Sequence, residues 1–329
     1  MRRLTLTVGL LVALHVALLG IRPKGSSGAP KATVGIVLDI GGRGDKSFND
    51  GAYAGGERAS RTLGVGVRYI EPGDGSDREA GLRLLTAEGM KLVIGVGFIF
   101  TDDLNALARD FPRTNFAGID YSPGATPPAN LAAIRFREEE GSYLVGAIAA
   151  LAGGSKKIGF VGGMDIPLIH KFEAGYRAGV AKVCPDCTVI AQYAGATPEA
   201  FRDPPRGKDL ALSQYRAGAN VIYQAAGATG LGVFEAAREA DRFVIGTDAD
   251  QYAEAPGHVL TSMVKHVDVA TFDIIQHFSG GVHEFGLADG GIGYVYDQRN
   301  RPLIPDAVHA KVDSLAADII AGRIHVPTR

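Results

Sequence analysis

Short apolar runs alternate with helical stretches from residue 31 onward, and this alternation restricts the fold more than any other feature of the chain. The apolar runs are continuous, which is typical of strands buried on both faces of a parallel sheet. Between them lie helical segments such as 49–63, 78–88, 138–151 and 171–183; in the last, Phe172, Tyr176 and Val180 share one face. Repeated strand–helix units of this kind predict an α/β fold.

Ten strands are expected, in two sets of five. They cover residues 33–38, 65–70, 92–96, 115–119 and 131–135, then 157–161, 188–192, 220–223, 243–246 and 258–262. A chain of 329 residues is long enough for two domains, each with its own core. The break between the sets falls near residues 135–137, just before an acidic helix start at Glu138, so two lobes are predicted.

The first 29 residues differ from the rest of the chain. Arg2 and Arg3 precede an apolar stretch at 8–19, and a small, polar segment follows at 21–29. This layout is typical of a secretory signal peptide, so we expect export with cleavage. An uncleaved membrane anchor is the alternative, although the run is shorter than the ~20 residues that span a bilayer. The remainder is expected to be soluble and extracytoplasmic.

The balance of charge and the absence of several known motifs argue against some classes of function. The formal net charge is −2 with no basic run, so no nucleic-acid partner is expected. The glycines of 41–44 do not form G-x-G-x-x-G, and no phosphate-binding loop occurs, so no nucleotide cofactor is expected. G-x-S-x-G and H-E-x-x-H are absent, and the histidines lack metal-ligand spacing. We therefore expect neither an enzyme nor a metal site, although the many carboxylates leave a hydrolase open.

Cys184 and Cys187 are the two cysteines of the chain. Zinc needs about four ligands, and no second C-x-x-C or H-x₃-H occurs. In an exported protein the expected state is a small structural disulfide between them. Free thiols and redox chemistry are the alternatives.

Acids and glycines follow nearly every expected strand, where parallel sheets bind ligands. Asp39 and Asp120 end strands of the first set, and Asp248 ends one of the second. A neutral ligand with hydroxyl and N–H donors suits such carboxylates, whereas a phosphate would be repelled. Each aspartate taken singly could instead be a helix N-cap.

Several segments, taken in order, resemble the basic membrane protein (Bmp) family of bacterial transporter-associated, purine-nucleoside-binding proteins. They are residues 34–39 continuing to 45–49, 159–165 leading into 171–176, 221–224, 227–232, 245–251 and 260–265. The likeness extends from about residue 33 to the end of the chain. It implies a type I periplasmic-binding-protein fold, with two Rossmann-like lobes of parallel sheets, three crossings between them, and the ligand in the cleft.

The resemblance also implies domain bounds and binding residues. The first lobe would hold residues 33–135 plus about 260–285, and the second 136–258 plus about 286–329. An aromatic pair would sandwich the base, and polar side chains would meet the edges of the base and the ribose. The implied binding residues are Asp45, Phe48, Asn49, Asp120, Phe172, Gly227, Gly230, Asp248 and Lys265. Phe172 could instead belong to the core, and Phe48 could be a hydrophobic staple.

The expected function is capture of a purine nucleoside, such as inosine, guanosine or adenosine, for the permease of an ABC transporter. We expect a monomer without a cofactor. Many family members are lipoproteins with a cysteine just after the apolar run; residues 1–29 contain none, so no lipid attachment is expected. Two rival functions remain: a nucleoside hydrolase that uses the cleft carboxylates, and a sensor whose closed form docks on a receptor.

Overall fold

The computed structural model describes residues 32–329 except 72, 74–76, 123 and 125. The expected signal peptide, residues 1–29, lies outside the described residues. Within the described part of the chain, none of the helices is both long and apolar enough to cross a membrane.

The first lobe is built on a six-stranded sheet in which every pair of neighbours is parallel. Its strand order is β11-β5-β4-β3-β1-β2. The strands are β1 (Ala32–Val37), β2 (Gly66–Ile70), β3 (Leu92–Val96), β4 (Asn115–Ile119), β5 (Leu131–Phe136) and β11 (Gly281–Phe285). The helices are α2 (Phe48–Leu63), α3 (Arg78–Ala87), α4 (Thr101–Asp110), α9 (Val267–Gln276) and the short η1 (Phe98–Phe100).

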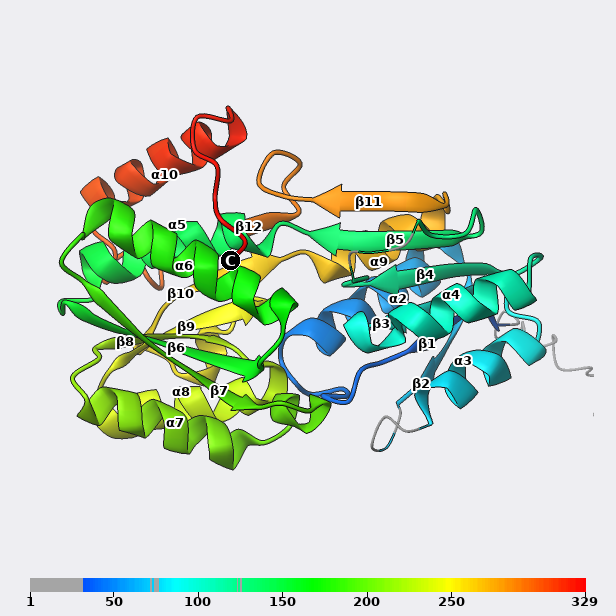
Figure 1. Cartoon of the computed structure of the whole chain (residues 1–329), viewed down its shortest axis with the longest axis horizontal. Coiled ribbons are helices and arrows are strands. Elements are labelled where there is room, and N and C mark those ends of the chain that lie inside the picture. The colour runs from blue at the N-terminus through cyan, green and yellow to red at the C-terminus, as the bar shows by residue number, and fades with distance from the viewer. Residues whose placement is uncertain (1–31, 72, 74–76, 123, 125) are drawn as a thin grey trace, which may run out of the picture.

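The second lobe repeats this plan, with the order β12-β10-β9-β8-β6-β7 and one antiparallel pair, β10 with β12. Figure 1 shows α5 and α6 on one face of its sheet and α7 and α8 on the other. The strands are β6 (Lys157–Met164), β7 (Thr188–Gly195), β8 (Val221–Ala225), β9 (Phe243–Asp248), β10 (Val259–Lys265) and β12 (Ile292–Tyr294). The helices are α5 (Glu138–Ala152), α6 (Pro167–Val183), α7 (Pro204–Arg216), α8 (Gly230–Ala240), α10 (Asp306–Ile320), η2 (Pro198–Phe201), η3 (Gly227–Thr229) and η4 (Tyr252–Glu254).

Burial explains why these runs become central strands. All five residues of β3 and of β8 are buried, as strands covered by helices on both faces require. One apolar core is shared by α3, α4 and the first sheet, and another by α7, α8 and the second sheet. A third core runs through both lobes and includes residues of α5, α6 and α9. Two mostly parallel α/β sheets confirm the predicted fold class.

The chain passes between the sheets three times, after β5, β10 and β11. The second passage differs from the expected boundary near residue 260. Residues 259–265 form β10, which pairs with β9 through contacts such as Val264 with Asp248, so they belong to the second lobe. Lys265 is consequently the last residue of a second-lobe strand, at the point where the chain leaves that lobe.

Two strands and one helix start were missed. β11 is an edge strand whose residues alternate between half-buried and exposed, and β12 has only three residues, so neither contains a continuous apolar run. Helix α6 begins at Pro167 rather than at 171, because a proline is well suited to the first helical position. The early start adds Leu168 and Ile169 to the end of α6 that faces the cleft.

Cys184 and Cys187 lie just after the end of α6 and are joined by a disulfide, with their Cα atoms 5.3 Å apart.

Candidate ligand-binding site

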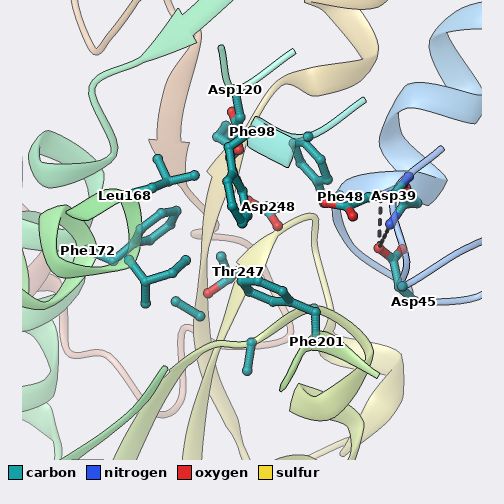
Figure 2. Close-up of a pocket in the computed structure, with 18 residues that line it drawn as sticks. Asp39, Asp45, Phe48, Phe98, Asp120, Leu168, Phe172, Phe201, Thr247 and Asp248 are labelled. Carbon is teal, nitrogen blue, oxygen red and sulfur yellow. Dashed lines mark hydrogen bonds and ion pairs between the residues drawn. The ribbon is translucent and has the colours of Figure 1, made fainter. Parts of the chain in front are cut away.

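A cavity lies between the two lobes at the carboxyl ends of their strands (Figure 2). It contains about 560 Å³ of empty space including its open mouth. The first lobe contributes Asp39, Gly41, Asp45, Phe48, Asn49, Gly97, Phe98 and Asp120, and the second contributes Leu168, Ile169, Phe172, Phe201, Ala225, Ala226, Gly227, Thr247, Asp248 and Lys265.

Lys265 stands at the centre of the charged wall of this cavity, with its side chain only 2% exposed. Its Nζ donates to Oδ2 of Asp120 at 2.8 Å and lies 3.6 Å from Oδ1 of Asp248. Oε1 of Glu138 is 3.8 Å away on a further side. The ammonium group therefore offsets the charge of carboxylates from both lobes. Among the described residues, no three His, Cys, Asp or Glu side chains are grouped to hold a metal ion.

Asp120 and Asp248 still have hydrogen-bonding capacity. Oδ1 of each is buried and has no hydrogen-bond partner within the protein. Both residues also adopt left-handed backbone conformations, with φ of 58° and 67°, which are uncommon for residues other than glycine. Strained residues of this kind cluster at functional sites. Two carboxylate oxygens are therefore held ready for donors that a bound molecule would supply.

Asp45 lines the same cavity, but its carboxylate is already occupied. Oδ1 accepts the backbone N–H groups of Ser47 and Asp50, and Oδ2 accepts the backbone N–H and the side-chain amide of Asn49. These donors lie at the start of α2, where N–H groups lack partners within the helix. Asp45 thus shapes the loop before α2. The amide of Asn49 continues the network, because its Oδ1 accepts the backbone N–H of Asp39 at 2.8 Å.

Asp39 lies two residues after the end of β1, against Gly97, the residue that follows β3. A Cβ atom on Gly97 would come 2.3 Å from Oδ2 of Asp39, and Gly97 has φ of 116°. Only glycine therefore fits this position without displacing the carboxylate. Asp39 is 8% exposed, and the backbone N–H of Ile40 donates to its Oδ1 at 2.6 Å.

Burial shifts the ionisation of these groups. It raises the pKa of Asp39 to about 7 and that of Asp45 to about 6. It also raises the pKa of Glu138 to about 7, although Lys171 and Lys265 act in the opposite direction. For Lys265 burial acts to lower the pKa, but the fields of Asp120, Asp248 and Glu138 outweigh it and raise the pKa above its usual value. Lys265 therefore stays charged in the closed cavity.

Four phenylalanines provide the apolar surface of the cavity (Figure 2). Phe48 and Phe98 come from the first lobe, and Phe172 and Phe201 from the second. The rings of Phe98 and Phe201 meet edge to face across the lobes, with centroids 6.3 Å apart. Lys265 lies 4.7 Å from the centroid of Phe48 and 5.5 Å from that of Phe172, so the aromatic and charged walls adjoin. The site therefore combines flat apolar surfaces with charged side chains, two of which can accept further hydrogen bonds.

The structure brings together eight of the nine residues expected at the site. Gly230 is the exception: it begins α8, and a Cβ there would come 2.2 Å from Oε1 of Gln224, so the residue packs against that side chain instead. Gly227, in η3, does line the cavity. The wall residues that the sequence analysis did not single out include Phe98, Leu168, Phe201 and Thr247. Phe98 and Phe201 lie in 3₁₀ turns that follow β3 and β7, and an aromatic residue shortly after a strand was the available signal.

A second cavity adjoins the first at Phe98, Asp120 and Leu168 and contains about 1520 Å³ of empty space, including open solvent. Glu138 and Lys171 line it; Nζ of Lys171 donates to Oε2 of Glu138 at 2.6 Å. Because Glu138 also approaches Lys265, the charged wall continues from the ligand cavity to the first passage between the lobes.

Known proteins are similar to this chain in both sequence and fold. The family model of the PnrA-like ABC transporter substrate-binding proteins, named Bmp, matches residues 32–329. The chain is 34% identical to the ABC transporter nucleoside-binding protein BmpA of Lactococcus lactis, over 93% of this chain and 92% of that one. It is 36% identical to an uncharacterized lipoprotein of Pyrococcus abyssi, over 89% of this chain and 77% of the relative.

Among solved structures, an ABC transporter solute-binding protein from Aeropyrum pernix superposes with a TM-score of 0.82 and 31% identity. The match covers 91% of this chain and 94% of that one. The family is extracytoplasmic and delivers small molecules to transporter permeases; it is not a family of enzymes. The chain belongs to the Bmp family of PnrA-like ABC transporter substrate-binding proteins.

Proposed function

We propose that this protein captures purine nucleosides between its lobes and presents them to the permease of an ABC transporter. The observation that carries the proposal is a pair of buried oxygens without a hydrogen-bond donor, Oδ1 of Asp120 and Oδ1 of Asp248, in the two carboxylates that pair with Lys265. A ribose offers two neighbouring hydroxyls that donate to such oxygens, while the ammonium group donates to a hydroxyl oxygen. Charge-assisted hydrogen bonds of this kind are stronger than neutral ones.

The aromatic wall suits the base. We propose that Phe48 and Phe172 face the two sides of a purine, with Asn49 at its edge and Gly227 under the sugar or base. Stacking on an aromatic side chain contributes roughly 1–3 kcal/mol per base in nucleic-acid complexes. Phe98 and Phe201 would close the remaining sides, since their rings already meet across the cleft.

The carboxylates favour nucleosides over nucleotides. Asp45, Asp120 and Asp248 line the cavity together with Asp39, which holds a proton up to about pH 7, whereas Lys265 is the cation among its lining residues. A phosphate placed there would meet a surplus of negative charge that water does not screen. The name of the Lactococcus lactis relative, a nucleoside-binding protein, agrees with this choice of ligand.

The proposal assigns Asp45 a different role from the one first expected. Its four hydrogen bonds to the start of α2 leave its oxygens engaged, so it would act by holding Phe48 and Asn49 in place. Action as a monomer and the absence of a lipid anchor stay predictions; the Pyrococcus abyssi relative is named a lipoprotein. Intact mass of the mature protein, with and without lipid, decides the second point.

Calorimetric titration tests the proposal. Protein unfolded and refolded to remove bound molecules is titrated with inosine, guanosine, adenosine and inosine 5′-monophosphate, with glucose and leucine as controls. We expect the nucleosides to bind and the monophosphate and controls to bind at least about a hundredfold more weakly, a difference of about 2.7 kcal/mol. Nucleosides that bind no better than glucose would overturn the proposal. Chromatography of the same mixtures for free base tests the hydrolase alternative, for which we expect no product.

A further inference from the structure

A buried set of hydrogen bonds joins the two lobes beside the cavity. The first lobe contributes the loop that precedes α2, and the second contributes the segment that follows β9. Oγ of Ser47 donates to Oδ2 of Asp248 at 2.6 Å and lies 3.3 Å from the backbone oxygen of Thr247. Nε2 of Gln251 donates to the backbone oxygen of Lys46 at 3.0 Å. Ser47 is 1% exposed and Gln251 2%, so both donor side chains are shielded from water.

Both partners are held in position by their own lobe. The backbone N–H of Ser47 donates to Oδ1 of Asp45 at 2.9 Å, which fixes the loop. On the other side, Oε1 of Gln251 accepts the backbone N–H of Thr247 and the amide of Gln224, at 2.8 and 2.9 Å. Groups that are already ordered lose little entropy when they meet, so the contact forms at low cost once the lobes close.

The carboxylate of Asp248 connects this contact to the ligand. Its Oδ2 accepts from Ser47, while its Oδ1 has no hydrogen-bond donor and lies 3.6 Å from Nζ of Lys265; the residue lines the cavity. Separation of the lobes would part Ser47 from Asp248, since they belong to different lobes, and would leave Lys265 as the partner of the carboxylate. Closure thus completes the binding site, and a bound molecule that uses Oδ1 stabilises the closed arrangement.

We propose that Ser47 is a positioning residue that latches the lobes shut over the ligand by orienting the carboxylate of Asp248. The proposal rests on the proposed function, because the nucleoside is the molecule that the closed cleft holds. Since the latch forms after the ligand has entered, it affects escape more than entry. Hinge closure around a ligand is a common switching motion, and the latch identifies the contact that ends it here.

The test compares dissociation and association rates of inosine in the full-length mature protein. Ser47→Ala removes the donor but keeps the backbone bond to Asp45. We expect its dissociation rate to rise about tenfold or more, as loss of a buried hydrogen bond to a charged group implies, with the association rate within about twofold of wild type. The matched control is Arg202→Ala, which removes an exposed bond between the lobes, from Nη1 of Arg202 to the backbone oxygen of Gly73. It is expected to dissociate at nearly the wild-type rate.

Two further readouts separate the outcomes. Thermal unfolding without ligand is expected to match wild type for Ser47→Ala, and small-angle scattering with saturating inosine is expected to show a larger radius of gyration than wild type. A variant that dissociates at the wild-type rate would overturn the latch alone. A variant that slows association and unfolds early would show a structural role and also overturn it. Wild-type protein that fails to bind inosine would instead overturn the proposed function, and with it the ligand that the latch holds.

Discussion

The loop before α2 and the wall formed by the ends of β4, β9 and β10 both place aspartates at the ligand cavity, but they use them differently. In the loop, Asp45 accepts four hydrogen bonds from backbone and side-chain donors of α2 and its approach. In the wall, Asp120 and Asp248 each keep one buried oxygen without a partner. Both kinds of aspartate are buried, so burial does not distinguish them. The hydrogen-bonding capacity that the fold leaves unused separates a structural carboxylate from one prepared for a ligand.

The largest effect is expected from substitution of Lys265, the cation that pairs with the carboxylates of the wall. Lys265→Met would leave Asp120, Asp248 and Glu138 buried without the ammonium group that lies within 4 Å of each. Breaking a buried ion pair by removing one partner costs about 3–5 kcal/mol, so the free energy of unfolding should fall by that order and nucleoside binding should be lost. Denaturant unfolding and calorimetry measure the two effects.

Lys171→Met is the matched control, because Lys171 pairs with Glu138 and Glu139 but is 26% exposed in its side chain and does not line the ligand cavity. We expect a smaller loss of stability and retained binding. Equal effects of the two substitutions on binding would contradict the central place given to Lys265.

Asp248→Ala is expected to weaken nucleoside binding at least about a hundredfold, about 2.7 kcal/mol, with little change in stability. The substitution removes both the free oxygen and the acceptor of Ser47, while Lys265 keeps its 2.8 Å bond to Asp120. Calorimetry and thermal unfolding check the two statements. Wild-type affinity in this variant would leave the ligand in place but refute the site assignment.

Asp45→Ala is expected to reduce stability more, and nucleoside binding less, than Asp248→Ala does. Four donors near the start of α2 lose their acceptor, so we expect the free energy of unfolding to fall by about 1–3 kcal/mol. Binding should weaken less than in Asp248→Ala, because the ligand does not contact the carboxylate directly. An Asp45→Ala variant that keeps its stability but binds nucleoside more weakly than Asp248→Ala would contradict the structural role assigned to Asp45.

The last expected effect depends on pH. Burial raises the pKa of Asp39 to about 7 from its ordinary value of 3.8, so between these values the folded protein holds a proton that the unfolded chain has released. This group therefore makes stability fall as pH rises from about 4 to about 7. Asp39→Asn removes the contribution, and we expect its stability relative to wild type to increase over that range. Unfolding curves at several pH values test this; a constant difference would contradict it.

The sequence predicted the fold better than the details of the site. Continuous apolar runs locate buried strands, and β3 and β4 were predicted to the residue. Edge strands lack that signal, since β11 is half exposed and β12 is very short. The bounds of the second passage depend on which neighbour β10 pairs with, which only the register with β9 shows.

Within the site, family motifs located Phe48, Phe172, Asp248 and Lys265 at the cavity, but their roles in binding stay proposals. The motifs could not show that Gly227 lines the cavity and Gly230 does not. Gly227 lies in the turn η3 and Gly230 begins α8, a difference in position that only the structure shows. Nor could they reveal that Asp45 is saturated with donors, which depends on how the loop folds back on α2. Phe98 and Phe201 meet across lobes from distant parts of the chain, a contact without local sequence pattern.

The most direct test of the central claim is a paired calorimetric titration of the wild-type protein with inosine and 2′,3′-dideoxyinosine. The two ligands share the purine and differ in the hydroxyls that are proposed to donate to the free oxygens of Asp120 and Asp248. We predict that the dideoxynucleoside binds at least about a hundredfold more weakly, because those buried oxygens would stay unpaired. Dissociation constants within about threefold of each other would show that Asp120 and Asp248 do not bind the ribose hydroxyls, and would contradict the proposed role of these residues.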